Sequence, residues 1–321
     1  MAGVDRNNPK RARSSESRYS LMEFMRDFPD DATCLEWLWR TRLSDDGTHA
    51  FCEKCDQMRV FKRYETGQRR QSWTCTGCGT HLHPTAGTIF HKSSTSLHLW
   101  FYAMYLMTST RCGISAKQLE RELGVTYKTA WRMFHLIRNE LMTQPTEPLT
   151  GSVEADETYV GGRPHSRDVR RDAQGRVKKG PGTKPKTVVF GAVERGGKVR
   201  ATIVPRGEKN GIATRTREFV LPEAVLYTDE YNAYDNVGKE FAAHERIKHR
   251  AQVYVEGDVH TQTIEGFWSL VKRGISGTHH AVSAKHLQGY LNEYVWRYNH
   301  RDLEGPDLFG LLLLRAANPS V

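Results

Sequence analysis

The stretch Gly151-Ser152-Val153-Glu154-Ala155-Asp156-Glu157-Thr158-Tyr159 is predicted to form the first strand of a mixed α/β domain and to present Asp156. A second predicted strand, residues 224–229, ends in Asp229, and Glu265 opens a helix-like stretch that reaches Lys272. Three convergent carboxylates are what hard divalent cations need in order to act on phosphodiesters. The sequence therefore predicts a catalytic site at which Asp156, Asp229 and Glu265 bind magnesium or manganese.

The predicted order of strands makes this convergence plausible in three dimensions. If Asp156 ends the first strand and Asp229 the fourth, the two can lie side by side on neighbouring strands. Glu265 would then approach from a helix across the sheet edge. Two ions about 3.5–4 Å apart would activate a water or a 3′-hydroxyl and stabilise the leaving oxygen.

Other acids compete for the same role. Glu154 has the same strand parity as Asp156, whereas Glu157 points to the other face. Both are interpreted as solvated surface acids, and so are Glu230, Asp235, Glu256 and Asp258. Glu265 is preferred because it starts a helix with apolar periodicity and because Lys272 follows two turns along the same face. Lys272 is predicted to contact a phosphate, with an ordinary surface lysine as the alternative. Trp268 is predicted to fill the core, with stacking on a nucleotide as the alternative.

The overall charge favours a polyanionic partner. The chain has 321 residues and a formal charge of +10, with an isoelectric point near 9.3. A generic basic surface explains the charge equally well. Residues 1–19 are basic and lack an apolar segment, so they are predicted to be a disordered tail and not a signal peptide. The longest apolar run, residues 308–314, is too short to span a bilayer. We therefore expect a soluble, cytoplasmic, nucleoid-associated protein.

Four of the six cysteines form two CxxC pairs. Cys52 and Cys55 are separated from Cys75 and Cys78 by 19 residues. This spacing is typical of a zinc ribbon, in which each pair supplies two thiolates to a tetrahedral zinc ion. A disulfide framework is the alternative, but nothing indicates secretion. Cys34 and Cys112 lie in apolar helical surroundings and are predicted to be inert core thiols.

Helical patterns flank the predicted ribbon. Residues 20–43 have helical spacing with a break at 29–31, and residues 96–142 are predicted to be mostly helical. Within the latter, Ser115 can cap one helix, Gly124 permits a turn and Thr126 can cap the next helix. This is a helix-turn-helix pattern, although short helical hairpins also occur in proteins that do not bind DNA. The predicted DNA contacts on the second helix are Tyr127, Lys128 and Arg132.

The pattern beyond residue 151 indicates an α/β sheet packed by helices. A hairpin is predicted at 187–204, a helix at 211–220, weaker strands near 244–248, and helices at 261–273 and 283–299. The segment 161–186 holds nine Lys or Arg residues and is predicted to track DNA phosphates, with a solvated loop as the alternative. Its predicted DNA contacts are Arg170, Arg171, Lys178 and Lys179. The predicted domains are a basic tail (1–19), a helical segment (20–48), the ribbon (49–95), the helix-turn-helix (96–143), a linker (144–150) and the catalytic domain (151–321).

The acidic motifs carry a family resemblance. Residues 153–162, 227–234 and 260–274, together with the helix from Tyr290 to Arg301, resemble bacterial insertion-sequence transposases of the ISXO-like group. These have a zinc ribbon ahead of a DDE catalytic domain. The resemblance implies an RNase H-like fold, metal-dependent transposition, and at least a dimer on DNA. It also implies that Asp156, Asp229 and Glu265 form the acidic triad, with Lys272 as the accompanying lysine. Gln262 departs from the asparagine expected in many relatives, and its role and that of His260 stay open.

The predicted function is therefore that of a DNA transposase. It would bind the terminal inverted repeats of its own element, cleave to expose 3′-hydroxyls and join them to target DNA by two-metal phosphoryl transfer. One alternative is a catalytically inactive or domesticated DNA-binding regulator that keeps the fold. Another is a plain metal-dependent nuclease without strand transfer.

Overall fold

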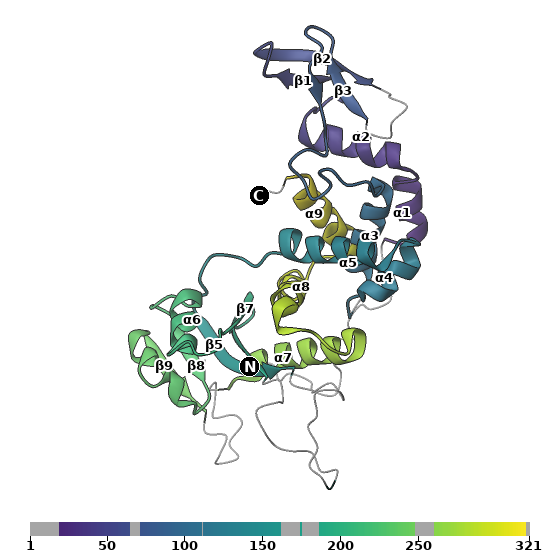
Figure 1. Ribbon diagram of the computed structural model, residues 1–321. Coiled ribbons are helices and arrows are strands. Elements are labelled where there is room, and N and C mark those ends of the chain that lie inside the picture. Colours follow the sequence, from purple (N-terminus) through teal and green to yellow (C-terminus); the bar gives the residue numbers. More distant parts are fainter. Residues whose placement is uncertain are drawn as a thin grey trace, which may run out of the picture. The chain divides into compact units, whose positions relative to one another are not determined.

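The computed structural model describes residues 19–64, 71–110, 112–161, 174, 186–247 and 260–318 (Figure 1). The chain divides into two compact units. Unit 1 comprises Met1–Leu141 together with Asp302–Val321, and unit 2 comprises Met142–Arg301. None of the described helices is both long enough and apolar enough to cross a membrane.

Unit 1 contains a small antiparallel sheet built around the four paired cysteines. Its strands are β1 (His49–Cys52), β2 (Gln57–Tyr64), β3 (Ser72–Cys75) and β4 (His81–Leu82), in that spatial order. The sheet packs on the helix that precedes it, because the Trp39 ring stacks on the Trp73 ring with centroids 4.7 Å apart. The Trp39 indole N–H also donates to the Gly47 carbonyl oxygen, at 2.8 Å. Apolar packing against α2 therefore stabilises this sheet independently of any metal that the cysteines bind.

The helices of unit 1 are α1 (Leu21–Asp27), α2 (Asp31–Arg42), α3 (Leu97–Ser109), α4 (Ala116–Leu123), α5 (Tyr127–Leu136), the π-helical turn η1 (Ile137–Leu141) and α9 (Gly305–Ala317). Two of them, α4 and α5, begin where the sequence predicts caps. The Ser115 and Thr126 hydroxyls accept the backbone N–H of Gln118 and Thr129. Gly124 ends α4 with φ of 61°, the left-handed conformation that favours glycine. These three predicted roles are confirmed.

Two predictions about the composition of unit 1 are wrong. The catalytic domain was expected to run to residue 321, but residues 302–321 belong to unit 1. The physical reason is Phe309 of α9, whose buried ring packs against the rings of Phe24 and Tyr105, at centroid distances of 5.9 and 6.1 Å. Cys34 is buried as predicted, whereas Cys112 is exposed because α3 ends at Ser109 and Cys112 lies in the turn that follows.

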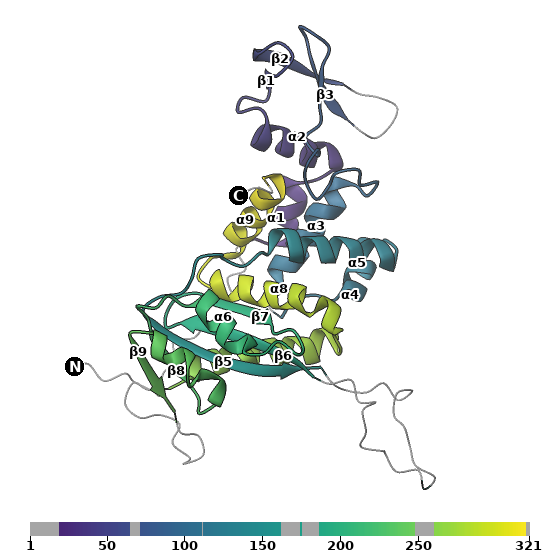
Figure 2. The ribbon, with the colours of Figure 1, turned by 60° about the vertical axis from the view of Figure 1, so that its left-hand side comes forward.

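Unit 2 is built on a five-stranded sheet with the order β7-β6-β5-β8-β9 (Figure 2). Its strands are β5 (Ser152–Val160), β6 (Thr187–Glu194), β7 (Val199–Ile203), β8 (Val225–Thr228) and β9 (Ala243–Arg246). The first three strands pair antiparallel, whereas β8 pairs parallel with β5, and β9 with β8. The strand that carries Asp156 is therefore the central one, covered by a neighbour on each side.

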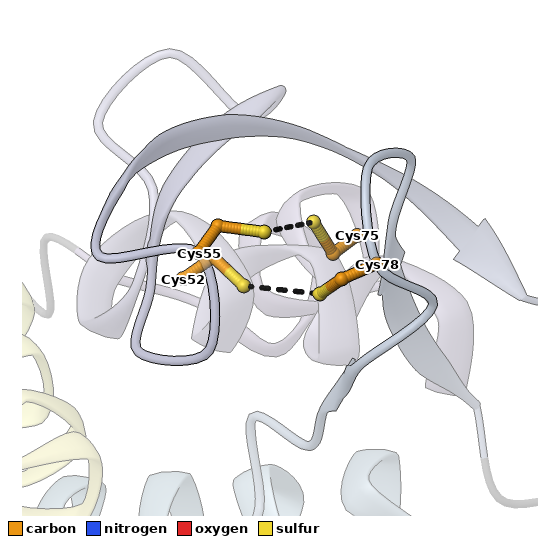
Figure 3. A group of neighbouring side chains, drawn as sticks. All are labelled: Cys52, Cys55, Cys75 and Cys78. Carbon is orange, nitrogen blue, oxygen red and sulfur yellow. Dashed lines mark hydrogen bonds between the residues drawn. The ribbon is translucent and has the colours of Figure 1, made fainter.

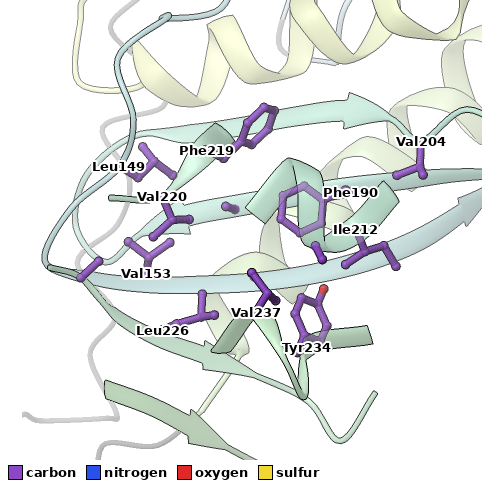
Figure 4. Packing of buried hydrophobic residues seen from close by; sticks show 14 residues of the cluster. Leu149, Val153, Phe190, Val204, Ile212, Phe219, Val220, Leu226, Tyr234 and Val237 are labelled. Atoms are coloured by element: carbon purple, nitrogen blue, oxygen red, sulfur yellow. The ribbon is translucent and has the colours of Figure 1, made fainter. Parts of the chain in front are cut away.

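Helices cover both faces of this sheet. On one face, α6 (Gly211–Phe219) and the 3₁₀ turns η3 (Asn232–Tyr234) and η4 (Val237–Glu240) enclose the apolar cluster drawn in Figure 4, which includes Val153, Phe190 and Leu226. On the other face lie α7 (Gln262–Gly274), the π-helical turn η6 (Ile275–His279), the 3₁₀ turn η7 (Ala284–His286) and α8 (Leu287–Asn299).

A glycine lets α7 approach the sheet closely. Gly191 of β6 is the cross-strand partner of Asp156. A Cβ built at Gly191 would lie only 2.5 Å from the Trp268 ring, so any larger residue would push α7 away. Trp268 is 3% exposed, which confirms its predicted place in the core.

Side-chain amides close one edge of the sheet. In β7, the backbone N–H of Val199 donates to the Asn299 side-chain amide, and the Val199 carbonyl accepts from the same amide. Ala201 makes the same pair of hydrogen bonds with the Gln144 side-chain amide. The Gln288 amide accepts the N–H of Ile203 at 3.1 Å. Exposed edge strands are templates for aggregation, and here the amides take the positions that another strand would occupy. They also tie α8 to β7 by hydrogen bonds at defined positions.

We predict that Phe309→Ala destabilises unit 1 by about 3–5 kcal/mol, the usual range for a buried phenylalanine. Leu314→Ala on the same helix is the matched control. Leu314 is 49% exposed, so its truncation should cost no more than about 0.5 kcal/mol. Urea unfolding in a reducing buffer that contains zinc measures both. Equal midpoints for Phe309→Ala and wild type would show that α9 does not belong to the core of unit 1.

Candidate active site

The pairing of β5 with β8 brings two aspartates to neighbouring positions. The parallel register aligns Val153 with Leu226 and Glu154 with Tyr227. Two residues further along each strand stand Asp156 and Asp229, the latter directly after β8 ends at Thr228. Neighbouring strands lie about 4.8 Å apart, so the two carboxylates are close at the carboxyl end of β8. The sequence predicted this adjacency.

Glu265 reaches the same region from the first turn of α7. Its Oε1 accepts a hydrogen bond from the buried Thr261 hydroxyl at 2.9 Å, which orients the carboxylate. Glu265, Ser269 and Lys272 are all exposed and recur at helical spacing, so they form one stripe along α7. Gln262, the first residue of α7, lies on the same exposed stripe.

The electrostatics of the cluster show that the acids act on one another. Burial raises the pKa of Asp156 to about 7, and the charges of Glu157, Asp229 and, more weakly, Glu265 add to the effect. Burial and the charge of Asp229 raise the pKa of Glu157 to about 7 as well. The buried Tyr234 hydroxyl donates to Glu157 Oε2 at 3.1 Å. In the metal-free protein the site therefore retains protons that ordinary surface acids would have lost.

The donor set fits a hard divalent cation, which prefers carboxylate oxygens. Asp156, Asp229 and Glu265 are the residues that would hold it. In the described part of the chain, their ligand atoms do not converge within 4.8 Å as the four cysteine sulfurs do. A cation bound there would offset both the burial and the neighbouring charges that raise the pKa of Asp156.

The sequence analysis interpreted Glu154 as a solvated surface acid, and this prediction is wrong. Its side chain is fully buried. It accepts hydrogen bonds from Arg195 and from the first turn of α7, and His260 Nδ1 lies 3.2 Å from its Oε1. The physical reason is that β5 is the central strand and α7 covers it at Glu154, so solvent does not reach this side chain. The parity prediction was correct, since Glu154 and Asp156 share the face covered by α7.

The four paired cysteines form a compact cluster in unit 1 (Figure 3). Their sulfurs all lie within 4.8 Å of one another, and the pairs Cys52–Cys78 and Cys55–Cys75 are 3.5 and 4.0 Å apart. Tetrahedral zinc with bonds of about 2.3 Å requires sulfurs roughly 3.8 Å apart. The Thr80 hydroxyl and backbone lower the pKa of Cys78, whereas the adjacent Cys78 sulfur raises the pKa of Cys55 to about 12, as expected for thiols held close together without a metal. The cluster therefore fits zinc.

The predicted DNA contacts on α5 lie on its outer face. Tyr127, Lys128 and Arg132 are exposed, while Phe134 is buried. The Lys117 ammonium lies over the Tyr127 ring, 5.3 Å from its centroid. The other predicted contacts, Arg170, Arg171, Lys178 and Lys179, lie outside the described residues.

Comparison with known proteins places this architecture in a family. The model of the ISXO2-like transposase domain matches residues 148–299, the span that carries all three acids. A protein of transposable element ISH50 from Halobacterium salinarum is 32% identical over 257 residues, which cover 77% of this chain and 84% of the relative. The chain belongs to the ISXO2-like family of insertion-sequence transposases. This membership assigns the protein to DNA transposition, with an activity of the polynucleotidyl-transferase or nuclease kind.

Two further comparisons are weaker. A transposase-like protein of Haemophilus influenzae is 28% identical to this transposase over 107 residues, 33% of this chain and 85% of the relative. The crystal structure of a pre-cleavage Mos1 transpososome aligns with 68% of this chain and 79% of that chain, at 12% identity and a TM-score of 0.24. The last alignment is too loose to support a structural argument.

We predict that the transposase purified under reducing conditions carries about one zinc per chain, and that Cys75→Ser loses it. The reason is that three thiolates bind zinc much less tightly than four. Cys112→Ser is the matched control, because Cys112 is exposed and outside the cluster. Elemental analysis measures both. A zinc-free wild type would contradict the assignment.

We predict that Asp156→Asn stabilises the magnesium-free protein at pH 7.5. The carboxyl of Asp156 has a pKa of about 7 in the folded protein and an ordinary value of 3.8. Between these values the folded state holds a proton that the unfolded state has released, so stability falls as the pH rises. Removing the carboxylate removes this cost.

The melting temperatures of wild type and the variant measure this effect. The buffer contains no chelator, because a chelator would remove zinc. The variant should melt several degrees above wild type at pH 7.5, and the difference should shrink at pH 5.5. Magnesium should stabilise wild type and not the variant. A variant that melts below wild type at both pH values would show that the acids do not repel as the geometry implies.

Proposed function

We propose that this protein is an active DDE transposase. It would bind the terminal inverted repeats of its insertion sequence, cleave to expose 3′-hydroxyls and join these to target DNA. The observation that carries the proposal is the parallel register of β5 and β8, which makes Asp156 and Asp229 neighbours, with the charge of Glu265 acting on Asp156. An RNase H-like arrangement of unit 2 is part of the same proposal.

The roles of the residues follow from their places. Asp156, Asp229 and Glu265 would hold two magnesium or manganese ions. When bound, such ions supply electrostatic stabilisation of the charge that develops on the reacting phosphate and its oxygens. Asp156 and Asp229 come from the rigid sheet and Glu265 from α7, so the scissile phosphate would be held between a strand end and a helix. Lys272 would contact a phosphate of the strand that lies along the exposed stripe of α7.

Unit 1 would supply DNA binding. The α4–turn–α5 segment presents an aromatic ring and two cations, Tyr127, Lys128 and Arg132, on the exposed start of α5. The N-terminal part of a recognition helix is the part that usually contacts base edges. The zinc ribbon would bind DNA or organise the surrounding fold. Since transposition joins two ends, at least two copies would act together on DNA.

Two alternatives have distinct signatures. A catalytically inactive or domesticated regulator would bind the ends specifically without cutting them, which the intact set of acids disfavours. A plain metal-dependent nuclease would cut without joining. A strand-joining assay with end-containing and target DNA separates that nuclease from a transposase.

The test is cleavage of end-containing DNA in the presence of magnesium. Asp229→Asn should reduce the rate at least about a hundredfold, because electrostatic groups of this kind are typically worth about 10²–10³ in rate. Glu223→Gln is the matched control, since Glu223 is exposed two residues before β8 begins. End binding should be unchanged in both variants. Undiminished cleavage by Asp229→Asn would overturn the proposed function.

A further inference from the structure

The buried carboxylate of Glu154 lies between the strand and the helix that carry the acids. It stands two residues before Asp156 on β5 and has no exposed surface. A fully buried carboxylate is costly unless donors surround it. The donors around Glu154 come from two segments of unit 2, Arg195 after β6 and the first turn of α7, and the more informative ones belong to α7.

Glu154 caps the N-terminus of α7. Its Oε2 accepts the backbone N–H of Thr263 at 2.8 Å and of Ile264 at 3.0 Å, and its Oε1 accepts the Thr263 hydroxyl at 3.0 Å. The first N–H groups of a helix lack partners within the helix, and an adjacent side chain usually satisfies them. Here the adjacent Thr261 makes no such bond and instead orients Glu265. The cap comes from the sheet.

The remaining contacts hold Glu154 in place. The Arg195 guanidinium, which follows β6, donates from Nε to Glu154 Oε1 at 2.8 Å and from a terminal nitrogen to the His260 carbonyl at 2.7 Å. It also stacks over the Tyr227 ring, 4.0 Å from the centroid. Both oxygens of Glu154 are therefore occupied by protein donors. Glu154 is not available as a metal ligand.

We propose that Glu154 is a positioning residue that fixes the start of α7, and hence Glu265, relative to Asp156 and Asp229. The inference rests on the proposed function of these three acids. Glu265 follows Ile264 directly, and Asp156 is two residues from Glu154, so one carboxylate links both halves of the site over short and rigid paths. Residues that orient ligands through hydrogen bonds typically contribute about 10–100-fold to metal affinity.

The experiment measures manganese binding to the zinc-loaded protein without DNA, by calorimetry and by electron paramagnetic resonance. Glu154→Gln keeps one acceptor but loses the charge and sets an amide NH₂ against N–H donors. It should weaken manganese binding at least about tenfold and speed hydrogen exchange of the Thr263 and Ile264 amides. Glu293→Gln is the matched control. Glu293 is equally buried and pairs with Arg297 one turn further along α8, so its loss should leave both readings unchanged.

Two further measurements keep the proposal testable if Glu154→Gln fails to fold. Glu154→Asp keeps the charge beside Arg195 but is one methylene too short to cap α7, so it should also weaken manganese binding. In wild type, the Thr263 and Ile264 amides should exchange slowly although they lie in the first turn, and fast exchange would overturn the proposal. So would a folded Glu154→Gln with wild-type manganese affinity. The proposed function fails if wild type binds no manganese, or binds it equally well after Asp156→Asn. In that case the hydrogen-exchange data alone test whether Glu154 caps α7.

Discussion

The parallel pairing of β5 with β8 is the constraint on which the rest of unit 2 depends, because it sets Asp156 beside Asp229. Burial is the main reason why the pKa of Asp156 rises to about 7, and repulsion by the charges of Glu157 and Asp229 adds to the effect. The apolar clusters on both faces of the sheet stabilise the unit against this repulsion. A site arranged in this way gives up stability in the metal-free state, and a cation bound to the acids would restore it.

Features set by neighbouring residues could be predicted from the sequence. Ser115, Gly124 and Thr126 were predicted correctly because a helix cap depends on one side chain and the backbone a few residues away. The cysteine spacing was equally informative, since two CxxC turns bring four sulfurs together whatever the details of the strands between them. The adjacency of Asp156 and Asp229 needed only the strand order, which the alternation of predicted strands and helices suggested.

Features set by distant residues could not be predicted. Phe309 packs against Phe24, a partner from the opposite end of the chain, so nothing local assigned α9 to unit 1. Glu154 had the signal of strand parity with Asp156, but its burial depends on β5 being the central strand. At the position of Glu154 the first turn of α7 covers the central strand, so this acid has no route to solvent. With the sheet order known, the same parity would have identified Glu154 as a buried acid in need of donors.

Glu154, which caps α7 from β5, and the side-chain amides along β7 both bind backbone groups that would otherwise lack a partner. In both places, backbone groups that regular structure leaves unpaired are satisfied by side chains from another element. Apolar packing alone is non-directional and allows a helix to slide or rotate on a sheet. Hydrogen bonds to particular backbone atoms do not. Both helices on the face of the sheet that carries Asp156, α7 and α8, are therefore held in register with it. A site built from a strand and a helix would require that register, because its groups must be placed to within about 0.5 Å.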